Sequence, residues 1–199
     1  MFRLAVVVLS MSMTVSAFAQ TSKLILHLHL TDSVKQSLDT GRISKIIVSG
    51  KCGGKDFNAT VKNTAAFTAD VAQGACKEHT LFLMNGTYYM VYETAFDVPQ
   101  EPWVEKTLDI PAVIVAGKMT NNGTPVAGQM NIFPSEHKPG DWGFAVPFDA
   151  EGRFEFPLPQ QGAWDLDVSD RGRHHLGKIR AAEFNNTEND FDVATSPTR

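Results

Sequence analysis

The chain has 199 residues, with 18 basic and 22 acidic side chains and a formal net charge of −4. This mildly acidic balance lacks the basic footprint that nucleic-acid phosphates need, and it offers no polybasic patch for anionic lipid. The apolar fraction, 43%, is that of an ordinary globular protein, which excludes a disordered or fibrous chain.

Residues 1–19 are expected to be a secretory signal peptide. Arg3 gives a short positive start, and Leu4–Leu9 is apolar. The small residues of Ala17-Phe18-Ala19 then fit a cleavage site before Gln20. The apolar run is far shorter than the ~20 residues that a membrane span needs. No later segment is apolar enough to cross a membrane, so we expect a periplasmic or secreted protein with no membrane span.

Residues 20–111 are predicted to form a first domain made of short strands. Leucines alternate with other residues over 24–31, which is typical of a half-buried strand, and Ser33–Gly41 is expected to be a turn or a brief helix. Asn85-Gly86 between two apolar runs predicts a tight hairpin, because both turn positions tolerate positive φ. Further strands are expected at 43–51, 57–61, 66–71, 79–84, 87–96 and 103–110.

Residues 112–193 are predicted to form a second domain of the same kind, followed by a tail at 194–199 with little to pack. Strands are expected at 112–119, 126–133, 143–148, 153–158, 164–168, 174–184 and 188–193. Strands of this length between Gly, Pro and Asn turns predict an all-β protein. The fold class is therefore two tandem antiparallel β-sandwich domains, immunoglobulin-like or transthyretin-like, after the signal peptide.

Three pairs of segments suggest that the two domains are copies of one unit. The matched segments are 46–52 with 113–119, 67–76 with 154–164, and 107–110 with 190–193. On this alignment Cys52 corresponds to Met119 and Cys76 to Trp164. We therefore expect Met119 and Trp164 to touch where the first domain has its two cysteines.

Cys52 and Cys76 are the only cysteines, and an even pair in an exported chain predicts a disulfide. The 25-residue ring that it closes corresponds to roughly 3.5 kcal/mol in the chain-entropy model. A two-thiolate metal site or a redox pair is the alternative. Neither is favoured, because the spacing is not Cys-x-x-Cys and only His79 lies close in sequence.

The second domain carries three motifs that also occur together in a known family. They are Val115-Ala116-Gly117-Lys118-Met119, Asn122-Gly123-Thr124-Pro125-Val126-Ala127-Gly128 and Asp149-Ala150-Glu151-Gly152-Arg153-Phe154. With them, residues 112–193 resemble the carboxypeptidase regulatory-like domains, small sandwiches of transthyretin-like topology. The resemblance implies a non-catalytic accessory or binding module.

No catalytic site is predicted, and no metal or cofactor is expected. His27 and His29 point to one face of a strand and could begin a metal site, but no third ligand is visible near them. Trp142, on a loop between Gly and Asp, is a candidate for a binding surface, with burial in the core as the alternative. Tyr88 and Tyr92 are expected to share one strand face, with Tyr89 on the other.

The sequence thus predicts a non-catalytic exported module that binds through sandwich surfaces, edges or loops such as that of Trp142. Its partner would be a protein or glycan of the cell envelope. The alternative is a small hydrolase or metal-dependent enzyme of transthyretin-like fold, which would need His27, His29 and an acidic residue to converge in one pocket. An inhibitor or an envelope structural protein is a third possibility.

Overall fold

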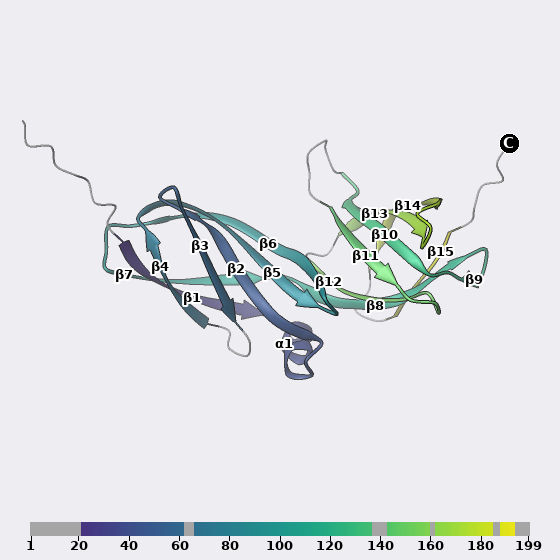
Figure 1. Ribbon diagram of the computed structural model, residues 1–199, viewed down its shortest axis with the longest axis horizontal. Helices are drawn as coiled ribbons and strands as arrows, with labels where there is room; N and C mark the ends of the chain where they lie inside the picture. Colours follow the sequence, from purple (N-terminus) through teal and green to yellow (C-terminus); the bar gives the residue numbers. More distant parts are fainter. Residues whose placement is uncertain (1–20, 62–65, 137–142, 160–161, 185–187, 194–199) are drawn as a thin grey trace, which may run out of the picture.

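The structure, a computed structural model, describes residues 21–61, 66–136, 143–159, 162–184 and 188–193. In these ranges the chain forms one helix and β-strands that build four sheets, arranged as two sandwiches end to end (Figure 1). The predicted fold class of two tandem β-sandwiches is confirmed. Within the described residues, no helix has the length and apolar content to cross a bilayer.

The first sandwich packs a three-stranded sheet, ordered β4-β1-β7, against a four-stranded sheet, ordered β3-β2-β5-β6. The helix α1 (Asp32–Asp39) follows β1 at the junction between the sandwiches (Figure 1). The strands are β1 (Thr21–Leu30), β2 (Ile43–Cys52), β3 (Lys55–Val61), β4 (Ala66–Ala72), β5 (Gly74–Met84), β6 (Thr87–Val98) and β7 (Trp103–Ile110).

The second sandwich repeats this plan, with sheets ordered β12-β8-β15 and β11-β10-β13-β14. Its strands are β8 (Val113–Asn121), β9 (Thr124–Pro125), β10 (Gly128–Pro134), β11 (Phe144–Phe148), β12 (Arg153–Leu158), β13 (Ala163–Asp170), β14 (His175–Glu183) and β15 (Glu188–Val193). One pairing in each sandwich, β1 with β7 and β8 with β15, is parallel. The sheets that contain these two pairings are therefore mixed, whereas the sheets β3-β2-β5-β6 and β11-β10-β13-β14 are antiparallel.

The two sandwiches have the same topology, but one of the three sequence matches is wrong. The order of pairing makes β1 equivalent to β8, β4 to β12, β5 to β13 and β7 to β15, which agrees with the second and third matches. The first match joined β2 to β8, whereas the equivalent of β2 is β10. Cys52, which lies opposite Cys76, therefore corresponds to Pro134, which lies opposite Trp164.

A glycine occurs in both segments of the first match, for separate reasons, and this explains why non-equivalent strands were matched. Gly50 on β2 and Gly117 on β8 each face a backbone carbonyl of a neighbouring strand, which a Cβ would meet at 2.2 Å and 1.9 Å. Close approach selects glycine at both places, although the strands are not equivalent. Met119 and Trp164 therefore lie in opposite sheets of the second sandwich, both fully buried. The expected contact between them stays a prediction.

The disulfide between Cys52 and Cys76 is present, with a Cα–Cα distance of 4.0 Å. It joins the neighbouring strands β2 and β5 within one sheet, and it does not bridge the two sheets. The Asn85-Gly86 hairpin also forms as predicted, with φ values of 50° and 80°.

The junction between the sandwiches is a packed interface. The ring of Tyr89, at the start of β6, lies 6.0 Å from that of Phe144 and 6.4 Å from that of Phe156 in the second sandwich. The Arg42 guanidinium donates a short hydrogen bond to the Glu155 carboxylate across the same junction. Aromatic and charged contacts therefore hold the two units against each other.

A bulge in β6 overturns the expected placement of the tyrosines. The pairing of β5 with β6 slips by one residue between Thr80 and Leu81. Tyr88 points to solvent, but Tyr92 turns inward and packs against the core with Tyr89. One inserted residue reverses the face of all that follows it along the strand.

Candidate functional site

The outer face of the four-stranded sheet in the first sandwich carries both charged and apolar side chains. Along β2, Ile46 and Val48 face the core, so Ile47 and Ser49 face solvent. The pairing of β2 with β3 and β5 brings the outward residues of three strands into rows across the sheet. These rows divide the face into a polar half and an apolar half.

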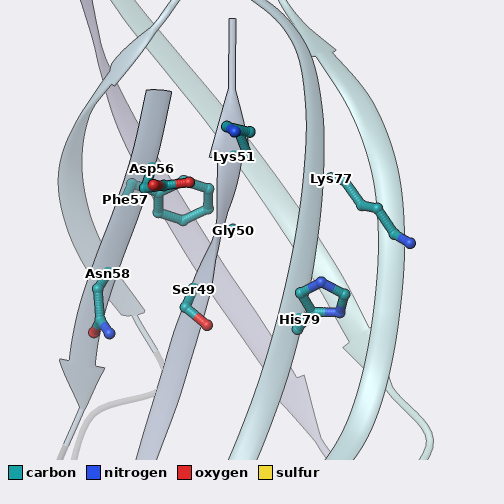
Figure 2. A pocket seen from close by; sticks show the side chains of 8 residues that line it. All are labelled: Ser49, Gly50, Lys51, Asp56, Phe57, Asn58, Lys77 and His79. Atoms are coloured by element: carbon teal, nitrogen blue, oxygen red, sulfur yellow. The ribbon is translucent and has the colours of Figure 1, made fainter. Parts of the chain in front are cut away.

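The polar half contains an open trough of about 550 Å³ over β3, β2 and β5 (Figure 2). Gly50 lies in its middle, paired with Phe57 on β3 and with Glu78 on β5. The pairing of strands places Ser49 between Asn58 and His79, and Lys51 between Asp56 and Lys77. Figure 2 shows the hydroxyl of Ser49 and the amide of Asn58 on adjacent strands, with Lys77 extending away from them.

Each lysine of the trough has a carboxylate on an adjacent strand, Asp56 for Lys51 and Glu93 for Lys77. The Glu93 carboxylate on β6 contacts both the Lys77 ammonium and Nδ1 of His79, each at 3.0 Å. Lys51 and Lys77 lie directly opposite each other on adjacent strands. Like charges in that arrangement destabilise a sheet. Such a pair is better suited to contacting an acidic group than to stabilising the fold.

The apolar half lies between the trough and the second sandwich. Leu81 lies opposite Ile47 and Met90, and Leu83 lies opposite Tyr88. These side chains are partly exposed and do not belong to the hydrophobic core. Tyr88 is 51% exposed, with the Lys45 ammonium 5.6 Å from the centre of its ring. We call Ile47, Leu81, Leu83, Tyr88 and Met90 the apolar patch.

One row of the trough resembles the composition of a hydrolase triad, with Ser49, His79 and Glu93 on three adjacent strands. The geometry does not support that role. Nδ1 of His79 makes no directed hydrogen bond in the described structure, although Glu93 lies within 3.0 Å. The neighbouring backbone N–H groups are used in strand pairing, so no oxyanion-stabilising donors converge on Ser49.

His27 and His29 do not converge with one acidic residue. Nε2 of His27 lies 2.6 Å from the Glu105 carboxylate, and Nδ1 of His29 lies 2.8 Å from that of Asp109. Each imidazole thus has its own carboxylate on β7, along the outer face of the three-stranded sheet. Within the described ranges, no group of three or more His, Cys, Asp or Glu side chains is placed to hold a metal ion.

Trp142 lies outside the described residues, so its place is not assigned. The structure instead places two other large side chains in solvent, Tyr88 on β6 and Trp103 on β7. Sequence reasoning missed Trp103 as a surface residue. Its signal was the alternation of Trp103 and Glu105 with Val104 and Lys106, which puts the indole on the polar side of the strand.

The core of the first sandwich contains an unusual group, the Glu78 carboxyl. It is fully buried, one oxygen accepts a hydrogen bond from the Thr80 hydroxyl at 2.5 Å, and the other has no partner in the described structure. Burial raises the pKa of Glu78 from 4.5 to about 7. Its side chain has no surface in water and lies inside the sandwich, which is the position of a structural group.

No protein-family model matches the chain, and no curated protein matches it. Among solved structures, the minor pilin GBS52 of Streptococcus agalactiae aligns with a TM-score of 0.41 and 11% identity, over 89% of this chain and 98% of that one. A candidate adhesin from Bacteroides ovatus aligns with a TM-score of 0.34 and 7% identity, over 90% and 94%. BcpA, the major pilin subunit of Bacillus cereus, aligns with a TM-score of 0.30 and 11% identity, over 88% and 70%. Likenesses of this size concern the fold alone.

Proposed function

We propose that this protein is an exported, non-catalytic binding module whose first sandwich contacts a protein partner in the cell envelope. The observation that carries the proposal is the apolar patch on the outer face of the four-stranded sheet. A sheet with one solvated face normally alternates apolar-in and polar-out. Here Leu81 and Leu83 stay outside while Phe82 and Met84 fill the core, so both faces of β5 are apolar.

The composition of this face is that of a protein interface. A typical interface has an apolar centre containing aromatic residues and a polar rim that fixes orientation. Tyr88 and Leu83 supply the centre, and the trough with Lys51 and Lys77 supplies the rim. The two lysines favour a partner that brings a carboxylate to the trough.

Three outer strands, β7, β11 and β12, are poorly suited to pairing with a strand of a partner. The outer strand β11 contains Pro147 and the outer strand β12 contains Pro157, and proline removes an N–H that an added strand would need. On the outer strand β7, Lys106 turns inward and lies 4.4 Å from the centre of the Phe96 ring. Inward charges of this kind protect an edge from pairing with another chain.

Export and family membership are part of the same proposal. The first 19 residues have the pattern of a signal peptide. The motifs that resemble carboxypeptidase regulatory-like domains fall on β8, on the turn into β9 and on the turn before β12. In that last turn the Asp149 carboxylate accepts the N–H groups of Glu151 and Arg153 at 3.0 and 2.8 Å. A non-catalytic accessory role would follow from membership in that family.

The proposal can be tested by placing a photo-crosslinking amino acid at position 88 and irradiating cells of the producing host. The matched control places it at position 183, where Glu183 is exposed on β14 of the second sandwich. We expect a discrete crosslinked protein at position 88 alone. The change Leu83→Lys should weaken that adduct about 30-fold, the equivalent of roughly 2 kcal/mol for a central interface residue.

Loss of the adduct in Leu83→Lys counts only if the variant is folded. Its Cys52–Cys76 disulfide and its resistance to protease should match those of the unaltered protein. Equal adducts at positions 88 and 183, or none at position 88, would rule out the four-stranded face as the binding surface.

A further inference from the structure

The outer face of the three-stranded sheet carries the most exposed of the described large apolar side chains, Trp103, with 59% of its surface in water. It is the first residue of β7, an outer strand, and it points away from the core. The Lys23 ammonium lies 5.1 Å from the centre of its ring. An indole that is fixed on a sheet and exposed to solvent can stack against a ring of a ligand.

Polar side chains continue from this indole along the same face. Glu105 follows two residues later on β7, and its carboxylate lies 2.6 Å from Nε2 of His27 on the adjacent strand β1. His29 and Asp109 form the next pair at 2.8 Å. Residues two apart on a strand are about 7 Å apart. The face therefore presents an aromatic plane followed by two imidazole–carboxylate pairs in a line.

The ionisable groups along this line occur in pairs. Lys23 lies opposite Asp70 on β4, and each histidine has its own carboxylate partner. With neutral histidines the carboxylates of Glu105 and Asp109 leave a negative excess on this line, which disfavours an anionic ligand. This differs from the trough on the other sheet, where two lysines face each other. A neutral ligand that offers many hydroxyl groups fits such a surface best, because each pair contains both a donor and an acceptor.

We propose that this face is a second binding site, and that its ligand is a neutral oligosaccharide with flat pyranose rings. The C–H groups of one ring would stack on the electron-rich face of the Trp103 indole. The hydroxyl groups of that ring and of its neighbour would exchange hydrogen bonds with Glu105 and His27. An apolar protein surface is a poorer occupant, because only the partly buried Ile25 flanks the indole with apolar surface.

The site can be tested with cellohexaose and chitohexaose as neutral probes and hexagalacturonate as a charged one. Amide chemical shifts of the isotopically labelled full-length mature protein report the residues affected by each titration. We expect the neutral hexasaccharides to bind with a Kd in the millimolar range and to shift amides of β1 and β7. Trp103→Ala should weaken binding about tenfold or more, and Glu105→Gln should weaken it less.

Tyr88→Ala is the matched control, because Tyr88 is similarly exposed but lies on the other sheet. It should leave the affinity for the hexasaccharides unchanged. The proposal fails if neither neutral probe shifts β1 and β7, or if Trp103→Ala binds as well as the unaltered protein. Equal binding of hexagalacturonate would overturn the inference that the site prefers a neutral ligand. Because the patch around Leu83 is not involved, these outcomes are independent of the crosslinking result.

Discussion

Replacing Glu78 with glutamine should stabilise the protein at alkaline pH and change it little at pH 4.5 or below. The Glu78 side chain has no exposed surface, and one of its oxygens has no hydrogen-bond partner within the described structure. Glutamine has nearly the same shape, keeps an acceptor for the Thr80 hydroxyl and carries no charge. The substitution therefore removes the cost of ionising this side chain inside the sandwich.

The size of the effect follows from the pKa of Glu78, which is about 7 in the folded protein against 4.5 for an exposed glutamate. Burial is the main cause; the nearby Glu93 charge adds to it and the Thr80 hydrogen bond opposes it. Below pH 4.5 the Glu78 carboxyl is protonated in both the folded and the unfolded state, so folding stability is not reduced. As the pH rises the unfolded state ionises first, so stability falls until the folded state also ionises above pH 7. At 1.36 kcal/mol per pKa unit, the total loss is about 3 kcal/mol.

Urea unfolding followed by far-ultraviolet circular dichroism at pH 4.5 and pH 8.5 measures this loss. The stability of Glu78→Gln relative to the unaltered protein should rise by about 3 kcal/mol between these two pH values. Carboxylates with lowered pKa values, such as Asp149 and Asp192, stop contributing to folding stability only as the pH falls. This loss is the same in Glu78→Gln and in the unaltered protein. Glu183→Gln, a change at an exposed position on β14, is the control. A difference between the two proteins that stays constant with pH would refute the argument.

Three further changes test other parts of the fold. Replacing both Cys52 and Cys76 with alanine should destabilise the protein by roughly 3 kcal/mol, with the larger loss of hydrogen-exchange protection in the first sandwich. Gly152→Ala should lower the thermal unfolding temperature much more than Gly86→Ala. Both glycines have positive φ, but a Cβ would meet a carbonyl oxygen at 2.2 Å at Gly152 and nothing within 4 Å at Gly86. Tyr89→Ala removes the ring that joins the sandwiches, so calorimetry should show about 3 kcal/mol of destabilisation and two transitions where the unaltered protein has one.

The strands and turns could be predicted from local pattern, but their partners could not. Alternating leucines locate β1, and Asn85-Gly86 locates the hairpin between β5 and β6, because each signal lies within a few residues. The parallel pairing of β1 with β7 joins segments about 80 residues apart, and nothing local specifies it. The same limit led the repeat match to join β2 with β8, on a glycine that both strands need for separate contacts.

The face that we propose for binding could not be located from the sequence for a related reason. When neighbouring residues such as Phe82 and Leu83 are both apolar, alternation cannot say which of them faces the core until the register is known. Glu78 is the converse case, because a lone glutamate in a strand is normally assigned to the solvent side. Only its position two residues from Cys76 and from Thr80, both buried, shows that it points inward.

The bond between Cys52 and Cys76 encloses β3 and β4, which belong to different sheets of the first sandwich. The enclosed segment leaves one sheet, crosses to the other and comes back before the ring closes. A host protease that nicked the chain between the two cysteines would therefore release no fragment, and the clipped molecule would still migrate as one band on a gel run without reductant. The same position in the second sandwich, with Pro134 opposite Trp164, has no such covalent tie, so a nick there would separate the halves as soon as the strands came apart.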